Sequence, residues 1–249
     1  FALGEGIFKS TDGGVTFTHL ASTKPSNLNS ATEAWSYVSK IVADPNNADR
    51  LIAATYGGVK VTTNGGSTWA KPATLNATAN FIDLAMSTDG SMVLACTGSN
   101  IYLSTDGGGT FGGNIMGTSG LPSSGVSLRM QVAIAPSDKN TMYVAIAASD
   151  GKLKSVLKSI DGGTSWTAIA LGGGVFNPFG DQGWYDIALG VHPTNKDMVF
   201  LGGQLELTRY TPTNGWETIA YWIGASQNVV HADMHGVMFN PNDPENMYV

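Results

Sequence analysis

The sequence is poor in cysteine and in charged residues, and each shortage excludes a class of protein. Its 249 residues include one cysteine, Cys96, so no disulfide can form within the chain. Cys96 lies in the apolar run 92–96, where a small buried side chain is expected. Only 13% of the residues are charged, against about 25% in an average domain, and the formal net charge is −6. An acidic chain without basic runs cannot neutralise phosphates, which excludes nucleic acid as the main partner.

Long apolar runs are also missing. No stretch of roughly 18 or more apolar residues occurs, so the sequence predicts no transmembrane segment. The chain does not begin with Met, and its first and last residues match the second and first halves of a repeat. We therefore expect a piece of a longer protein.

Glycine, by contrast, is abundant, with 32 residues, and it recurs within one motif. Segments 10–17, 62–69, 104–111 and 159–166 all read Ser/Thr-x-Asp/Asn-Gly-Gly-x-Ser/Thr-Trp/Phe, and segment 213–216 resembles a degenerate fifth copy. The acidic or amide positions are Asp12, Asn64, Asp106, Asp161 and Asn214, which lie 42 to 55 residues apart. A period of roughly 40 to 55 residues is typical of a four-stranded propeller blade.

Each part of this motif has a structural role. A short Asp or Asn side chain can accept hydrogen bonds from its own turn, and a pair of glycines permits the positive φ angles of a tight hairpin. The closing Trp or Phe is expected to anchor the hairpin in the core, where one ring removes roughly 150–250 Å² from water. We interpret the motif as a folding device and not as an active site.

The motif resembles the Asp-box (BNR) repeat of sialidases, xyloglucanase-type glycoside hydrolases, sortilin-type receptors and secreted bacterial propellers. The segments 183–188 and 231–235 are similar to parts of Bacteroidetes-type secreted propellers. This resemblance implies an all-β fold, a β-propeller of four-stranded blades with Asp-box hairpins. About five blades would be visible, as part of a larger propeller at the cell surface or outside the cell.

The chain order fits six consecutive pieces of such a propeller. Residues 1–20 end one blade, 35–71, 80–111, 128–168 and 184–220 form further blades, and 231–249 starts another. Their turns align at Pro45, Thr88, Pro136, Pro193 and Pro241. Before each turn an alternating apolar row predicts packing between blades. The row consists of Ile41/Ala43, Leu84/Met86, Val132/Ile134, Leu189/Val191 and Val237/Phe239.

Polar residues start the first strand of each blade, at the face opposite the Asp-box turns. The predicted binding residues around this opening are Lys40, Arg129, Trp184, Tyr185, Trp222, His231 and His235. The candidate catalytic carboxylates are Asp83, Asp186 and Asp233, because glycoside hydrolysis commonly uses two carboxyl groups flanking the scissile bond. Aromatic faces beside carboxylates suit sugar rings, although packing between blades is the alternative for each ring.

Two further chemistries are conceivable at this opening, a metal site and the arginine triad of sialidases. His231, Asp233 and His235 alternate along the chain as metal ligands can, but hydrogen bonding is the preferred interpretation, and no metal or cofactor is predicted. The three arginines, Arg50, Arg129 and Arg209, lie in different blade positions, so they do not form the arginine triad of sialidases.

The sequence leaves three functions open. The first is a secreted or surface propeller that binds a glycan or protein at the channel mouth. The second is a glycoside hydrolase that cleaves a polysaccharide through two Asp carboxylates. The third is a structural component of a larger extracellular assembly. The Asp-box does not discriminate among them, because the same repeat serves enzymes and binding proteins.

Overall fold

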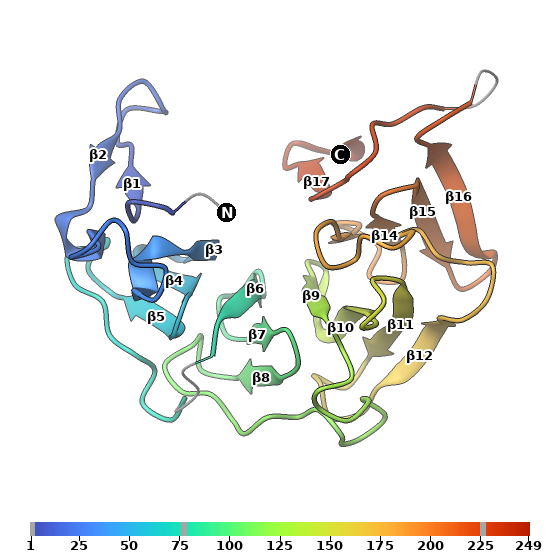
Figure 1. Cartoon of the computed structure of the whole chain (residues 1–249), viewed down its shortest axis with the longest axis horizontal. Coiled ribbons are helices and arrows are strands. Elements are labelled where there is room, and N and C mark those ends of the chain that lie inside the picture. The colour runs from blue at the N-terminus through green and yellow to red at the C-terminus, as the bar shows by residue number, and fades with distance from the viewer. Residues whose placement is uncertain (1–2, 76–78, 225–227) are drawn as a thin grey trace. The chain divides into compact units, whose positions relative to one another are not determined.

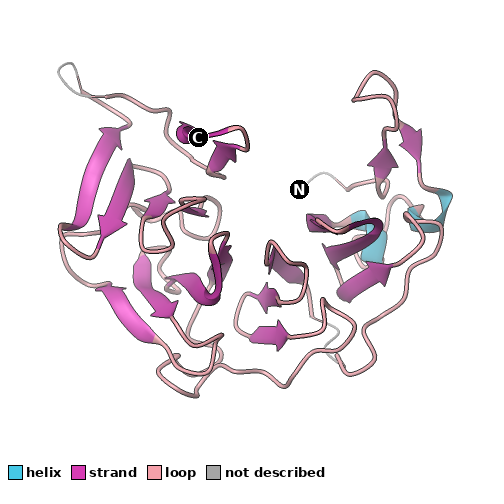
Figure 2. Cartoon of the chain, turned by 180° about the vertical axis from the view of Figure 1, so that it is seen from behind, coloured by secondary structure: helices cyan, strands magenta, loops and turns pink. Residues whose placement is uncertain are grey.

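The computed structural model describes residues 3–75, 79–224 and 228–249. These residues form eighteen β-strands and two three-residue 3-10 turns, η1 (Ala21–Thr23) and η2 (Ala34–Ser36), and Figure 2 shows how little helix there is. No described helix is long and apolar enough to cross a membrane. The predicted all-β class is confirmed.

The chain divides into two compact units, which are described separately. The first comprises residues 1–97 and 102–114, and the second comprises residues 98–101 and 115–249.

The sheets of the first half of the chain are short and antiparallel (Figure 1). A two-stranded hairpin contains β1 (Phe8–Lys9) and β2 (Thr18–His19). The next sheet contains β3 (Val38–Asp44), β4 (Asn47–Thr55) and β5 (Gly58–Thr62), and a third contains β6 (Phe81–Met86), β7 (Val93–Thr97) and β8 (Ile101–Ser104). In every sheet the strands follow one another in chain order, as tight hairpins require.

The second unit contains two complete four-stranded sheets with the same sequential order. One consists of β9 (Arg129–Ala135), β10 (Asp138–Ala147), β11 (Leu153–Ser159) and β12 (Thr167–Leu171). The other consists of β13 (Ala188–Val191), β14 (Val199–Gly202), β15 (Glu206–Thr211) and β16 (Gly215–Tyr221). A final hairpin pairs β17 (Met238–Asn240) with β18 (Asp243–Tyr248). Four sequential antiparallel strands are the expected content of one blade.

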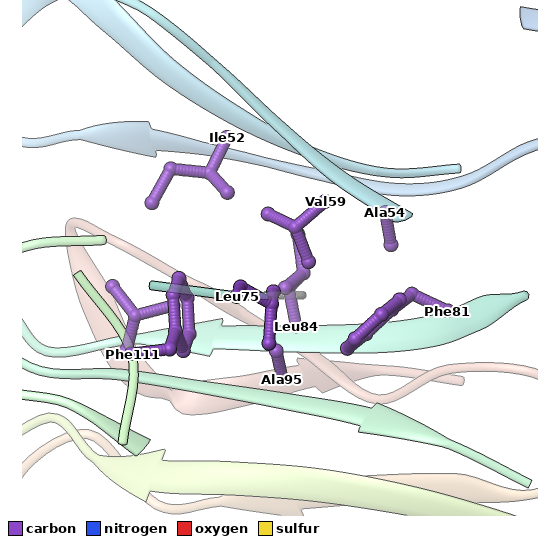
Figure 3. Close-up of a cluster of buried hydrophobic side chains, with 9 residues drawn as sticks. Ile52, Ala54, Val59, Leu75, Phe81, Leu84, Ala95 and Phe111 are labelled. Carbon is purple, nitrogen blue, oxygen red and sulfur yellow. The ribbon is translucent and has the colours of Figure 1, made fainter. Parts of the chain in front are cut away.

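The core lies between neighbouring sheets. In the first unit, Ile52 of β4 and Val59 of β5 belong to one buried cluster with Phe81 and Leu84 of β6, and Figure 3 shows these side chains between the strands. In the second unit, the apolar run of β10 is buried along its whole length, on both faces of the strand. Buried second strands therefore read as continuous apolar runs, as strands covered on both faces do.

Side chains close the repeated Asp-Gly-Gly turns. In the 159–166 turn, Ser159 Oγ donates to Asp161 Oδ1 at 2.8 Å and accepts the N–H of Gly163 at 2.9 Å. Ser165 donates both its N–H and its Oγ–H to the Asp161 carboxylate. These hydrogen bonds stabilise the ionised form and lower the pKa of Asp161 to about 2. Gly163, at φ +88°, occupies a conformation that L side chains rarely adopt.

Other copies of the turn follow the same pattern, with one exception. Asp12 and Asp106 accept hydrogen bonds from their Ser and Thr neighbours in the same way. The amide oxygen of Asn64 accepts from Thr62 and Thr68, and its amide nitrogen donates to Thr68. The degenerate copy differs, because the Asn214 amide donates to Glu217 instead. Segment 213–216 is therefore a hairpin turn without the repeated network.

The aromatic anchors behave as predicted only where a neighbouring sheet covers them. Phe111 and Trp166 are buried, and Trp69 packs edge-on against Trp35. Phe17, in contrast, is 63% exposed, which corrects the expectation that every closing aromatic is a core anchor. Its hairpin has only two short strands, so too few side chains surround the ring.

The predicted packing row also fails at its first members. Ile41 is 39% exposed and Ala43 is exposed as well, whereas Leu84, Val132, Ile134 and Val191 are buried. The face of β3 that carries Ile41 meets the small β1–β2 hairpin and leaves a groove of about 310 Å³ beside Phe8, Leu51 and Trp69. Burial of this row thus depends on the size of the neighbouring sheet.

The turn network predicts a measurable stability effect. Replacing Ser159 with Ala leaves the buried Gly163 N–H without its acceptor, and we expect the free energy of unfolding to fall by about 1–3 kcal/mol in urea denaturation. Ser10→Ala removes the same bonds from the exposed β1–β2 hairpin and is expected to cost less than half as much. Equal losses in the two variants would contradict the structural role of the buried turn.

Candidate functional site

The candidate site is built on a tight turn that precedes β13 in the second unit. The N–H groups of Tyr185 and Asp186 both donate to the carbonyl of Gln182, at 2.7 and 3.0 Å. The N–H of Gly183 donates to the carbonyl of Gly151 at 2.8 Å, and a Cβ at Gly183 would lie 2.6 Å from that oxygen. Only glycine permits this close approach, so turn 182–186 is fixed against the loop between β10 and β11.

Arg129 holds the outer part of this turn. It begins β9, and its Nη1 donates to the backbone carbonyls of Trp184, at 3.4 Å, and of Tyr185. Arg129 thus binds the backbone of the turn and not its side chains. Both aromatic rings are exposed to solvent: Trp184 is 52% and Tyr185 41% exposed, with ring centroids 5.5 Å apart. The turn therefore presents two adjacent aromatic rings to solvent on a fixed backbone.

Segment 231–236 lies against this turn. The buried Met234 anchors the segment, because its N–H donates to the carbonyl of Gly203 at 3.1 Å and its side chain packs closely on Gly202. The ring of His235 meets the ring of Tyr185 edge-on, with centroids 4.6 Å apart. Asp233 has a φ of +65°, which is uncommon for a residue other than glycine.

Asp186 directly follows the two aromatic residues and closes the same turn. The residue is 0% exposed, and in the described part of the chain neither carboxylate oxygen has a hydrogen-bond partner that meets normal geometry. Burial raises the pKa of Asp186 to about 7, the negative charge of Asp233 adds to the increase, and Arg129 opposes it. Asp186 is thus held largely as the neutral acid below pH 7, next to a second carboxyl group.

This arrangement supports two kinds of chemistry. Exposed aromatic faces beside hydrogen-bonding groups can stack on sugar rings, and a neutral carboxylic acid next to a carboxylate can take part in acid–base catalysis. The burial of Asp186 weighs against the second, since a substrate atom cannot touch it in this conformation.

The other predicted site residues are distributed as follows. In the first unit, Lys40 Nζ lies 3.9 Å from Asp83 Oδ1; the lysine side chain is half-exposed and the aspartate is buried. In the second unit, Trp222 follows β16, at the opposite edge of its sheet from β13, and its N–H donates to the carbonyl of Leu205. His231 is exposed, and its Nδ1 lies 2.6 Å from the Ala232 carbonyl. A single opening shared by all of these residues stays a prediction.

The alternative metal site is not formed. Within residues 3–75, 79–224 and 228–249, no three His, Cys, Asp or Glu side chains are arranged to hold a metal ion. Alternation along a strand had placed His231, Asp233 and His235 on one side, but these residues precede β17, and the positive φ of Asp233 breaks the alternation.

Sequence reasoning missed the residues that position the site through their backbone. Gln182 and Gly203 contribute carbonyl oxygens. Phe179 is fully buried, and its carbonyl accepts the N–H of Gln182 at the start of the turn. The pattern of side chains along a sequence carries no signal for a carbonyl acceptor. Gly183, directly before the aromatic pair, was the one available sign of a close approach.

Comparisons with known proteins identify the fold. No protein-family model matches the sequence, and no curated protein matches it. Among solved structures, the GH74 xyloglucanase from Xanthomonas campestris matches with a TM-score of 0.63 and 16% identity, over 86% of this chain and 35% of the enzyme. The extracellular domain of a putative one component system from B. thetaiotaomicron matches with a TM-score of 0.64 and 14% identity, over 96% of this chain and 28% of that protein.

A third match is the Swd1 beta-propeller domain from Myceliophteria thermophila, with a TM-score of 0.54 and 10% identity, over 83% of this chain and 60% of that domain. The chain has a β-propeller fold. The propeller predicted from the repeats is therefore confirmed, and the chain spans about a third of the length of the first two proteins. At these identities the matches show the fold alone.

The buried acid predicts an unusual pH dependence. From pH 3.8 to about 7 the unfolded chain releases the Asp186 proton while the folded protein keeps it, so stability falls as the pH rises. At about 1.4 kcal/mol per pKa unit, the loss is at most about 4 kcal/mol. In urea denaturation across this range, Asp186→Asn should lack this component, and Asp181→Asn, which changes an exposed carboxylate of the same loop, should retain it. The same pH profile in wild type and Asp186→Asn would contradict the assignment.

Proposed function

We propose that this chain is part of an extracellular or cell-surface Asp-box (BNR-repeat) propeller, of the sortilin-like and xyloglucanase-like type, that binds a glycan. The ligand surface consists of Trp184, Tyr185 and His235, with Arg129 and Asp233 beside it. The observation that carries this proposal is the pair of exposed rings on a backbone fixed by Arg129 and Gly183. The extracellular B. thetaiotaomicron domain and the xyloglucanase of similar fold support the location and the ligand class.

The physical argument is one of preorganisation. A sugar ring offers C–H groups on its faces and hydroxyl groups around its rim, so it can stack on an aromatic ring and hydrogen-bond at the edge. The turn carbonyls are already bound to Arg129, and the Tyr185 ring already contacts His235, so little freedom is lost when a ligand binds. A protein ligand at the same surface is the alternative, since exposed Trp and Tyr side chains also dominate protein interfaces.

Binding is tested with a matched pair of tryptophan variants. We expect a plant or microbial polysaccharide to bind in a glycan screen, and Trp184→Ala to weaken its affinity at least about tenfold, which is about 1.4 kcal/mol. Trp222 is similarly exposed, at 47%, but lies at the other edge of the sheet, so Trp222→Ala should bind like the wild type. Equal losses in the two variants would contradict the assigned surface. Absence of any glycan binding would favour a protein ligand or a structural role.

Glycoside hydrolysis is the second candidate. It is favoured by one observation, the neutral Asp186 beside the Asp233 carboxylate, because glycosidases need one protonated and one ionised carboxyl group. Asp83, the third carboxylate considered, belongs to the first unit, where it pairs with Lys40. We rank hydrolysis below binding because Asp186 is fully buried.

Hydrolysis is tested on the polysaccharides that bind. We expect no release of reducing ends by the wild-type protein above the level of Asp186→Asn. Turnover that Asp186→Asn and Asp233→Asn both abolish would overturn this ranking and identify a glycoside hydrolase.

A further inference from the structure

Two segments of the second unit meet at the candidate site, and each is anchored separately. Turn 182–186 is anchored by Gly183 and Arg129 to the loop and strand on one side. Segment 231–236 is anchored by Met234 to the end of β14 on the other side. Between the two anchors, the segments face each other through Asp186 and Asp233 and through the rings of Tyr185 and His235.

The two carboxyl groups cannot both be ionised without cost. Two acceptors cannot hydrogen-bond each other, and a buried carboxylate without a partner is strongly disfavoured. Neither oxygen of Asp186 has a partner among the described residues, so a proton is the simplest way to convert one of them into a donor. The neutral Asp186 could then donate to the Asp233 carboxylate, a short charge-assisted hydrogen bond.

The backbone at Asp233 adopts an uncommon conformation that its surroundings maintain. A positive φ of +65° is uncommon for a residue other than glycine, and surrounding contacts must maintain it. Met234 fixes the next residue, and a bond to Asp186 would fix the side chain itself.

We propose that Asp186 is a buried positioning residue, whose neutral carboxyl group donates a hydrogen bond to Asp233 and thereby holds segment 231–236 against the turn that carries Trp184 and Tyr185. Ionisation of Asp186 breaks this bond, places two like charges side by side and separates His235 from Tyr185. The ligand surface is then lost. This last consequence rests on the glycan-binding function proposed above.

Few other charged groups face this pair. Arg129, from β9, is the nearby cation that favours ionised Asp186, and its Nη1 donates to the carbonyls of Trp184 and Tyr185. His235 contacts the Tyr185 ring, and His231 lies beside the Ala232 carbonyl. The test therefore needs a variant that changes Asp186 alone and leaves both histidines in place.

The coupling can be measured without any glycan. We expect the methyl signal of Met234, assigned with Met234→Leu in Met-methyl-labelled protein, to shift between pH 5 and 9 with a midpoint near 7. In Asp186→Asn the amide can still donate to Asp233 and cannot ionise, so this shift should disappear. In Asp233→Asn the repulsive charge is gone, so the midpoint should move to lower pH.

Each outcome decides the proposal. A Met234 signal that does not change with pH in the wild type would overturn it, and so would a shift that persists unchanged in Asp186→Asn, because Asp186 would then not be its source. If Asp186→Asn does not fold, an unmoved midpoint in Asp233→Asn overturns the proposal by itself.

The consequence for the ligand is tested separately. For a glycan that binds at pH 6, we expect wild-type affinity to fall about tenfold for each pH unit above the midpoint, and the affinity of Asp186→Asn to stay constant. A parallel fall in both proteins would overturn the role of Asp186 in binding. If no glycan binds at any pH, the proposed function fails, while the Met234 titration still decides whether the two segments are coupled.

Discussion

The candidate site depends on one constraint, the burial of a carboxyl group whose oxygens have no hydrogen-bond partner of normal geometry among the described residues. Asp186 is fully buried at the end of turn 182–186, shortly before β13. The nearby charge that raises its pKa further is that of another acid, Asp233. Most buried carboxylates in proteins are paired with a cation or bonded to several N–H groups. Here the nearby Arg129 donates to backbone carbonyls, and the Asp186 carboxyl group is neutralised by binding a proton. The fraction of molecules that hold this proton depends on pH.

The repeated turns explain how the rest of the fold supports this site. Side chains of Ser, Thr and Asp close each hairpin locally, so the strands of a sheet pair in sequence without long-range help. The turns at 62–69, 104–111 and 159–166 follow the third strand of their sheets, whereas Asp186 precedes the first strand, β13. The conserved geometry of the turn and the variable chemistry of the site therefore occupy different positions in the repeat, which is how one fold can carry many functions.

Much of the fold could be predicted from the sequence because its determinants are local. Asp12, Asp106 and Asp161 form the expected turns, and Pro45 and Pro136 separate consecutive strands as expected. The failures involve burial, which depends on neighbours that are distant in sequence. Phe17 and Ile41 match buried residues of other repeats, yet both are exposed, because the adjoining β1–β2 hairpin is too small to cover them.

The candidate site was predictable in composition but not in geometry. Alignment of the repeats selected Arg129 and Asp186, the cluster 231–235 added Asp233, and the structure brings these three residues together. The sequence did not reveal that Arg129 binds backbone carbonyls, that Asp186 is inaccessible, or that Asp233 has a positive φ. It also grouped Trp222 with Trp184, although the two lie at opposite edges of one sheet, because residues shared by a loop region need not share a surface.

The most direct test of this account is the carboxyl ¹³C NMR titration of Asp186, assigned by comparison with Asp186→Asn. The account predicts a midpoint near pH 7, set by burial and by the charge of Asp233. A midpoint near 3.8, the ordinary value for an aspartate, would show that this carboxyl group is solvated or paired, and would contradict the account.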